Sequence, residues 1–206
     1  VSSQGDDAME CAPDRPLADG HSLPKVTVPD VTTLREKLPW RGGDLQTLAH
    51  RITFRKQQIP GSCRVMDFPL HDGSGDCMTG TLHDPGQDRP LVVLLHGVSG
   101  SEDSVYMLET TQHLVKLGWP VLRLNHRGAG SSLLRCTQTY HCSGTADIAA
   151  VLDQLPDPLT RNGVFLAGFS MGGTILLNLL AQGNVDPAIL GAMTISAPLD
   201  LVASAE

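Results

Sequence analysis

The chain has 206 residues, of which 41% are hydrophobic and 18% charged, and this suits one globular domain with a sizeable core. The formal net charge of −7 argues against nucleic acid or an anionic membrane surface as the main partner. No run of about 18 apolar residues occurs and the N-terminal residues are polar and acidic, so we expect neither an integral membrane segment nor a signal peptide.

Cysteine usage and glycine patterns bear on location and cofactors. The five cysteines are an odd number without C-x-x-C spacing, which favours reduced thiols and a cytoplasmic location. A zinc site built from Cys136, His141, Cys142 and His126 matches no common ligand template, so we expect no metal. Because the phosphate-binding pattern G-x-x-x-x-G-K-[ST] is missing from the sequence and residues 128–130 are too short a glycine pattern, we also expect no nucleotide cofactor.

The first part of the chain differs in composition from the rest. Residues 1–38 begin with a stretch rich in Asp, Pro, Gly and Ser, and we predict a tail or surface strap. Residues 39–206 are predicted to form the core domain. Within it, Trp40 is expected to be a packing anchor, and Asp44 is a candidate N-cap of a short helix.

Strand signals follow in chain order. Residues 64–70 and 77–82 flank a turn-rich segment and predict a hairpin. The continuous apolar run at 91–95 is typical of a strand that is covered on both faces, as in a parallel sheet. Residues 120–125 repeat this pattern and are followed by an expected loop that reaches Gly144.

Helix signals alternate with these strands. A helix is predicted from residues 101–104 to Leu117, another over 147–155 that stops at Pro156, and a third that ends near Gln182. Strands are predicted at 163–169 and 189–195. Strand and helix alternate four times, which predicts an α/β fold with a mostly parallel, doubly wound sheet and an antiparallel N-terminal hairpin.

One short motif carries the chemistry. Ser170 is the central residue of a G-x-S-x-G pattern, with an apolar strand before it and a helix after it. Glycines on both sides let the strand and helix approach closely, so the serine is expected to adopt a strained backbone and to present its hydroxyl to solvent. The N-terminus of the next helix would then lie beneath any negative charge that develops there. The alternative is a tight turn in which the serine is only a polar filler.

Several blocks together resemble one superfamily. HGVSGSEDS at 96–104, NHRG at 125–128, AGFSMGG at 167–173 and SAPLD at 196–200 follow predicted strands, and GDLQTL at 43–48 precedes them. The chain from about residue 39 onward resembles the α/β-hydrolase superfamily, in particular the YheT-like esterase branch that is related to the abhydrolase-domain lipases and phospholipases. The resemblance implies an α/β-hydrolase fold that is incomplete at the C-terminus.

The resemblance implies roles for the catalytic positions. Ser170 would attack an acyl carbonyl, and the N–H groups of Met171 and Val98 would donate to the oxyanion, where the loss of one donor costs roughly 100- to 1000-fold in turnover. His96, Gly97 and Phe169 would contact the substrate. In this family the histidine before that glycine shapes the loop, so His96 is not expected to act as a base. His126 and Arg127 are expected to fix a loop that borders the pocket.

The chain departs from the family in its acid and base. In α/β-hydrolases the acid and then the histidine follow the nucleophile, whereas the last histidine here is His141, before Ser170. Asp186 and Asp200 come too early to match the acid, and neither is assigned. Because losing the base costs on the order of a million-fold, we expect these residues alone to be nearly inactive. Residues 189–195 would also form an uncovered sheet edge, so we expect the N-terminal two-thirds of a longer hydrolase.

The sequence thus predicts a serine hydrolase of carboxylic esters, acting on a small-molecule ester or a lipid. Two alternatives stay open. One is a non-catalytic relative that uses the same pocket to bind a ligand or partner, and the other is an enzyme that transfers the acyl group to an acceptor other than water. The acyl chain, the alcohol portion and the oligomeric state are not predicted.

Overall fold

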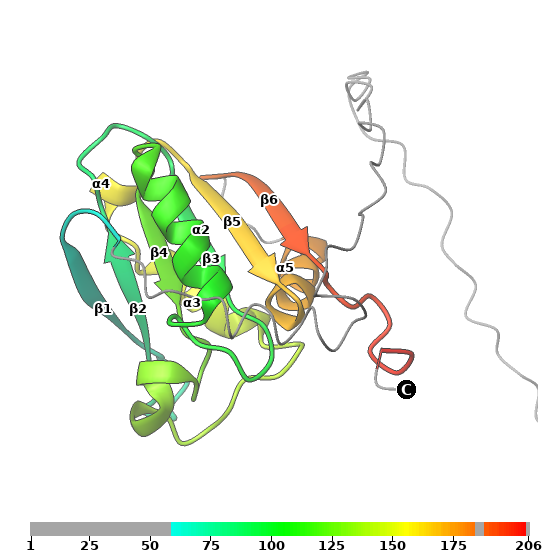
Figure 1. Cartoon of the computed structure of the whole chain (residues 1–206). Coiled ribbons are helices and arrows are strands. Elements are labelled where there is room, and N and C mark those ends of the chain that lie inside the picture. Colours follow the sequence, from blue (N-terminus) through cyan, green and yellow to red (C-terminus); the bar gives the residue numbers. More distant parts are fainter. Residues whose placement is uncertain (1–58, 184–187, 205–206) are drawn as a thin grey trace, which may run out of the picture. The chain divides into compact units, whose positions relative to one another are not determined.

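The computed structural model describes residues 59–183 and 188–204 (Figure 1). The described residues do not include the predicted tail at 1–38, Trp40, the helix expected after Asp44, or Asp186. The domain boundary at residue 38 stays a prediction.

Within the described residues, one mixed sheet has the strand order β1-β2-β4-β3-β5-β6. Its strands are β1 (Cys63–Pro69), β2 (Cys77–His83), β3 (Leu91–Leu95), β4 (Val121–Leu124), β5 (Val164–Phe169) and β6 (Ile189–Ile195). The helices are α2 (Val105–Lys116), the 3₁₀ helix η1 (Gly130–Arg135), α3 (Thr145–Asp153), α4 (Asp157–Thr160) and α5 (Met171–Ala181).

Pairing within the sheet confirms the predicted fold class. β1 and β2 form the antiparallel hairpin, and β2 also pairs antiparallel with β4. β4, β3, β5 and β6 are mutually parallel. Leu95 of β3 is paired with Gly168 of β5, so the loops that follow these two strands leave the sheet side by side.

Apolar residues cover both faces of the sheet, as the continuous run in β3 predicts. Leu91, Val93 and Leu95 belong to the cluster that includes buried residues of α3 and α5. Val92 and Leu94 point to the other face and pack in the cluster that contains Met107 and Val115 of α2. Figure 1 accordingly shows α2 on one face and α3 and α5 on the other.

Three local predictions need correction. The expected loop before Gly144 contains η1, where the buried Ser132 hydroxyl accepts the N–H of Thr79 at 2.9 Å and anchors the turn to β2. A short helix, α4, follows the stop at Pro156, with proline near its start where no N–H is needed. Helix α2 begins only at Val105, because the Ser104 side chain accepts the N–H of Ser101 in a turn that precedes it.

Candidate active site

Ser170 lies on the sharp turn between β5 and α5 and has the strained backbone that the motif predicts. Its φ of 50° and ψ of −121° are unusual for a residue with a side chain. A β-carbon on Gly168 would come 2.6 Å from the carbonyl oxygen of Gly172, and one on Gly172 would come 2.5 Å from that of His96. The two glycines of the motif are therefore required by close backbone contacts.

The hydroxyl of Ser170 is available for reaction. Ser170 is half-buried, and its Oγ forms no hydrogen bond with the described part of the chain. This oxygen is also not one of the fully buried side-chain atoms that lack a partner there. The carbonyl of Ser170 accepts the N–H groups of Gly173 at 2.8 Å and Thr174 at 3.1 Å, whereas the N–H of Met171 has no acceptor among the described residues.

The loop after β3 lies directly against this serine. A β-carbon on Gly97 would come 3.1 Å from the Ser170 β-carbon, 3.7 Å from its Oγ and 3.3 Å from the carbonyl oxygen of Phe169. The side chain of Val98, the next residue, is exposed. Gly97 therefore lies against Ser170, and the donor role of Val98 stays a prediction.

Two tyrosines engage the N–H groups on either side of Val98. The N–H of Gly97 donates to the hydroxyl of Tyr106 at 3.0 Å, and that of Ser99 donates to the hydroxyl of Tyr140 at 2.9 Å. The N–H of Val98 has no acceptor within residues 59–183 and 188–204. The N–H groups of Val98 and Met171 are thus both without an acceptor among the described residues.

Two buried histidines, His96 and His126, form hydrogen bonds that hold the loop after β3. The N–H of His126 donates to Nε2 of His96 at 3.1 Å, so His96 is assigned the tautomer whose Nδ1 donates to the carbonyl of Gly97 at 2.8 Å. Nε2 of His126 donates to the carbonyl of His96 at 2.9 Å. Burial lowers the pKa of His96 and lowers that of His126 to about 3, so both rings are neutral near pH 7.

These contacts decide what His96 can do. Both of its ring nitrogens are occupied, and its side chain is fully buried at 0% exposure. It cannot accept a proton without breaking the loop, in agreement with the expectation that it is not a base. The lack of exposed surface also argues against direct contact with substrate, so we assign His96 to loop geometry.

Arg127 joins three segments beneath the same edge of the sheet. Its guanidinium is buried and contacts Asp76 at 2.7 Å, Asp72 at 2.8 Å and Asp147 at 3.3 Å. The carboxylate of Asp76 also accepts the N–H of Thr137 at 2.7 Å. Hydrogen bonds from Thr137 and Arg127 hold the pKa of Asp76 well below its usual range. Arg127 thus fixes the hairpin turn and α3 directly, and the loop near residue 137 through Asp76. Its role is to hold these segments in place.

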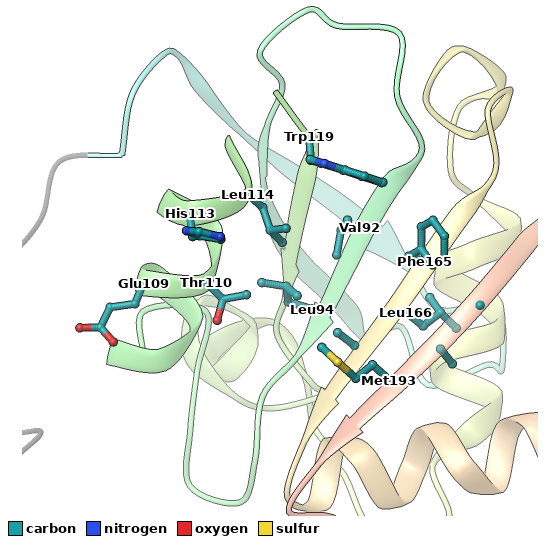
Figure 2. Close-up of a pocket in the computed structure, with 13 residues that line it drawn as sticks. Val92, Leu94, Glu109, Thr110, His113, Leu114, Trp119, Phe165, Leu166 and Met193 are labelled. Carbon is teal, nitrogen blue, oxygen red and sulfur yellow. The ribbon is translucent and has the colours of Figure 1, made fainter. Parts of the chain in front are cut away.

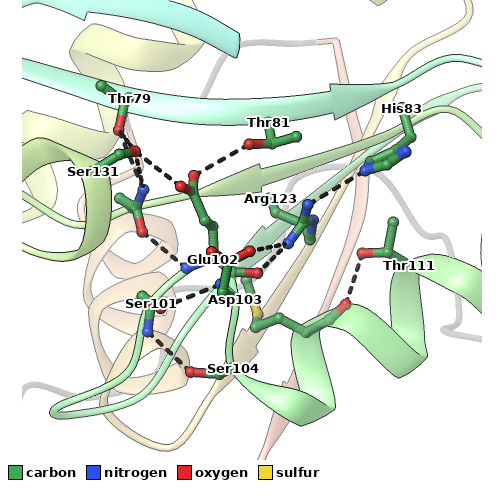
Figure 3. Close-up of polar contacts among 12 residues, drawn as sticks. Thr79, Thr81, His83, Ser101, Glu102, Asp103, Ser104, Thr111, Arg123 and Ser131 are labelled. Atoms are coloured by element: carbon green, nitrogen blue, oxygen red, sulfur yellow. Dashed lines mark hydrogen bonds and ion pairs between the residues drawn. The ribbon is translucent and has the colours of Figure 1, made fainter. Parts of the chain in front are cut away.

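A second polar network fixes the turn at residues 101–104 (Figure 3). The side chain of Asn125 accepts the N–H of Glu102 at 2.8 Å, and the buried carboxylate of Glu102 accepts the hydroxyl of Ser131 at 2.8 Å. Arg123 contacts the carbonyl of Glu102 and donates to Nε2 of His83 at 3.3 Å. Burial next to Arg123 lowers the pKa of His83 to about 4. The network holds the segment between the loop that follows β3 and α2.

One apolar cavity lies away from the serine. It has a volume of about 780 Å³ and opens between α2 and the strands β3, β5 and β6 (Figure 2). Its lining is mostly apolar and includes Trp119, Phe165 and Met193, but not Ser170. The cavity therefore lies on the α2 face of the sheet and does not include the predicted nucleophile.

Other sequence expectations are placed as follows. The ring of Phe169 packs against Tyr106, with ring centroids 4.8 Å apart. Asp200 accepts the N–H groups of Val202 and Ala203, both at 3.0 Å, and so caps a turn.

In the described ranges, no group of three or more His, Cys, Asp or Glu side chains could hold a metal ion. None of the helices there is both long and apolar enough to cross a bilayer. Cys63, Cys77, Cys136 and Cys142 are free thiols.

Sequence reasoning missed the tyrosines. Tyr106 and Tyr140 are separated from the motifs they serve, and neither belongs to a recurring pattern. Asp72 and Asp76 were also missed, although their place next to the hairpin turn was predicted. Only the chain's path brings these side chains to the loops after β3 and β4.

Comparisons with known proteins agree with this fold. The family model described as "alpha/beta hydrolase fold" matches residues 90–205. Protein abhd-3.2 of Caenorhabditis elegans is 33% identical over 166 residues, which are 79% of this chain and 44% of that protein. The putative esterase YheT of Escherichia coli (strain K12) is 28% identical over 171 residues, 82% of this chain and 50% of YheT. Phospholipase ABHD3 of Homo sapiens is 29% identical over 126 residues, 61% of this chain and 31% of the phospholipase.

A solved structure shows the same fold. The esterase Pf2001 of Pyrococcus furiosus aligns with a TM-score of 0.58 and 23% identity, covering 68% of this chain and 53% of the esterase. The chain spans half or less of the length of the three curated relatives described above.

Proposed function

The chain belongs to the α/β-hydrolase family, and from that premise we propose that it carries the nucleophile and oxyanion site of a serine hydrolase of carboxylic esters, acyl lipids included. The observation that carries the proposal is the strained turn at Ser170, against which Gly97 of the loop after β3 lies. The N–H groups of Met171 and Val98 have no acceptor among the described residues, which supports their assignment as donors. Relatives named as an esterase and a phospholipase support ester substrates.

The proposed reaction begins at the serine oxygen. Oγ of Ser170 attacks the ester carbonyl carbon, and the π electrons of the C=O bond move onto the oxygen. That oxyanion accepts hydrogen bonds from the N–H groups of Val98 and Met171, and the N-terminus of α5 adds a favourable dipole. When the tetrahedral intermediate collapses, the carbonyl forms again and the alcohol leaves with a proton. Water then attacks the acyl-serine and releases the acid.

This reaction needs a base that takes the serine proton. Both ring nitrogens of His96 are occupied, and the ring of His126 is buried and donates to a backbone carbonyl. No histidine follows Ser170 in the sequence. We propose that the acid and the histidine are supplied by sequence beyond Glu206, and that these 206 residues alone retain only the small rate that oxyanion and binding contacts provide.

The same observation favours a second candidate function. A chain that has the pocket but no base could bind a ligand or partner without turning it over. The two candidates differ at Ser170, because only the hydrolase requires its oxygen to react.

A cytoplasmic location also remains part of this proposal, in keeping with the four free cysteines among the described residues.

A fluorophosphonate probe tests the proposal directly. Oγ of Ser170 attacks phosphorus and displaces fluoride, and mass spectrometry locates the adduct. We expect slow labelling at residue 170 in the wild type and none in Ser170→Ala. Ser196→Ala is the matched control, since Ser196 has a similar φ of 53° just after β6. Labelling that persists in Ser170→Ala, or a wild type that never reacts, contradicts the nucleophile and favours a binding protein.

A longer chain tests the missing base. We expect ester hydrolysis to rise by roughly a million-fold when the reading frame beyond codon 206 is expressed with these residues. Competition between water and an alcohol as acceptor then distinguishes hydrolysis from acyl transfer. A stop codon directly after Glu206 in the natural gene would contradict this part of the proposal.

A further inference from the structure

We infer that Tyr106 and Tyr140 are positioning residues: their hydroxyls hold the loop at residues 96–100 so that the peptide N–H of Val98 is left for the oxyanion. This inference rests on the function proposed for Ser170. Neither tyrosine needs to touch the reacting atoms, because each acts through a backbone N–H next to Val98.

The pattern of hydrogen bonds along the loop supports this role. The N–H of Gly97 donates to Tyr106 and that of Ser99 to Tyr140, at 3.0 and 2.9 Å, while the N–H of Val98 between them has no acceptor among the described residues. Ser99 also has a φ of 56°, which is strained for a residue with a side chain. Such strain persists only where the surroundings fix the backbone, and the Tyr140 hydroxyl provides one such contact.

Tyr106 is itself fixed by the strand that carries the nucleophile. It lies in the first turn of α2, and its ring packs against Phe169, the residue before Ser170, with centroids 4.8 Å apart. A β-carbon on Gly100 would come 2.7 Å from the Tyr106 hydroxyl oxygen, so glycine leaves the space that this hydroxyl occupies. Tyr106 therefore contacts both the loop at residues 96–100 and the residue before the serine, and one side chain fixes the distance between them.

Tyr140 is fixed by His126, a buried histidine that donates to the start of the loop at residues 96–100. Its ring stacks on that of His126 with centroids 5.0 Å apart and an interplanar angle of 19°. Its N–H donates to the carbonyl of Arg127 at 3.0 Å, and His126 in turn donates to the carbonyl of His96 at 2.9 Å. The loop that contains Tyr140 and the start of the oxyanion loop are thus held by one set of contacts.

Losing either hydroxyl should move the Val98 peptide. The half-buried N–H of Gly97 that loses its acceptor seeks another, because an unpaired polar group away from water is costly. The exposed N–H of Ser99 can bond water instead, so the loss of Tyr140 releases that end of the loop. Rotation of the peptide at residue 97 or 99 then turns the neighbouring N–H of Val98. Since removing an oxyanion donor outright costs roughly 100- to 1000-fold, we expect a displaced donor to slow the reaction of Ser170 by at least about 10-fold.

The test compares Tyr106→Phe and Tyr140→Phe with the wild type. Thr111→Val is the matched control: it also lies on α2 and loses one hydroxyl, which donates to the carbonyl of Met107 at 2.7 Å. The first readout is the rate of fluorophosphonate labelling. The second is the amide proton shift of Val98 in ¹⁵N-valine protein, before and after Ser170 is phosphonylated, with Val98→Ala used to assign the signal.

We expect the Val98 amide proton to move downfield on phosphonylation in the wild type and in Thr111→Val. In both tyrosine variants this shift should be lost or greatly reduced, and labelling should be at least about 10-fold slower. Tyrosine variants that keep the wild-type shift and rate would overturn the inference, even though the serine is then a confirmed nucleophile.

Amide hydrogen exchange separates this inference from the proposed function. If the wild type forms no adduct, the function proposed for Ser170 fails, but the hydrogen bonds can still be tested. The amide of Gly97 should exchange about 10-fold faster in Tyr106→Phe, and that of Ser99 about 10-fold faster in Tyr140→Phe, as expected for one lost hydrogen bond. Unchanged exchange at both amides would contradict the role of the tyrosines.

Discussion

Gly97 lies so close to Ser170 that a β-carbon on the glycine would come 3.1 Å from the β-carbon of the serine. The two residues are 73 positions apart by their numbers, yet they occupy adjoining loops because β3 and β5 are parallel neighbours. The contact brings the loop that contains the unbonded N–H of Val98 against the turn at Ser170, and the chemistry proposed for the chain depends on it.

Replacing Gly97 with alanine should therefore impair Ser170 more than it impairs folding. The added methyl crowds the Ser170 β-carbon and the carbonyl of Phe169, which must shift by a few tenths of an ångström. We expect labelling by fluorophosphonate to fall by at least about 10-fold and the free energy of unfolding to fall by about 1 kcal/mol. Gly80→Ala in β2 is the control, since the added β-carbon would come 2.9 Å from the side chain of Leu122 in β4. Equal labelling losses in both variants would contradict the prediction.

The donor role of Val98 belongs to its peptide group and not to its side chain. Val98→Pro removes the N–H, so labelling should fall by roughly 100- to 1000-fold. Val98→Ala keeps the N–H and removes only part of an exposed side chain, so its rate should stay within about 2-fold of the wild type. The measurement is the labelling rate of each variant, with circular dichroism to confirm folding, and it distinguishes the N–H from the side chain. A large loss in Val98→Ala would point to the side chain instead.

The strain at Ser170 should be measurable as stability. Glycine adopts a φ of 50° without penalty, whereas alanine keeps the strain. Ser170→Gly is therefore expected to be more stable than Ser170→Ala by about 1–3 kcal/mol in urea unfolding. Ser104→Gly serves as the control, because Ser104 has an ordinary φ of −59° and glycine there should not stabilise. A Ser170→Gly variant no more stable than Ser170→Ala would mean that the turn is relaxed.

Acid should destabilise the protein partly through His83. Its pKa is about 4 in the folded chain, below the ordinary 6.5, because it is buried next to Arg123. The unfolded chain takes up the proton first, so this contribution to stability is complete above pH 6.5 and is lost as pH falls toward 4. His83→Gln removes the titration but keeps an acceptor for Arg123. Between pH 7 and 4 the wild type should lose up to about 3 kcal/mol more than this variant; parallel pH profiles would exclude the effect.

The face of the sheet near β6 should promote self-association. Met193 of β6 is 58% exposed among the described residues and lines the apolar cavity beside α2. We expect Met193→Lys to reduce concentration-dependent association of the 206-residue chain in sedimentation velocity. Leu134→Lys, which replaces a 96% exposed leucine of η1, should have little effect. Association unchanged in Met193→Lys would show that this face is not involved.

The sequence by itself determined a mostly parallel sheet with an antiparallel hairpin, and a strained turn at Ser170. Continuous apolar runs need cover on both faces, and this requirement holds wherever the run at 91–95 lies in the fold. Glycines around Ser170 act on their immediate neighbours, so a strained turn could be predicted from five residues. Local turn chemistry was less readable: η1 and the start of α2 depend on where the side chains of Ser132 and Ser104 find partners.

Only the tertiary structure decided which N–H groups are free and which are bonded. Tyr106 and Tyr140 reach Gly97 and Ser99 because α2 and the loop after η1 fold back over β3, and nothing in the spacing of these residues indicates that contact. His96 likewise reads as a possible substrate contact until its two ring nitrogens are seen to be occupied. Hydrogen bonds between distant segments depend on the path of the chain, and a path is set by the packing of the whole sheet rather than by any one motif.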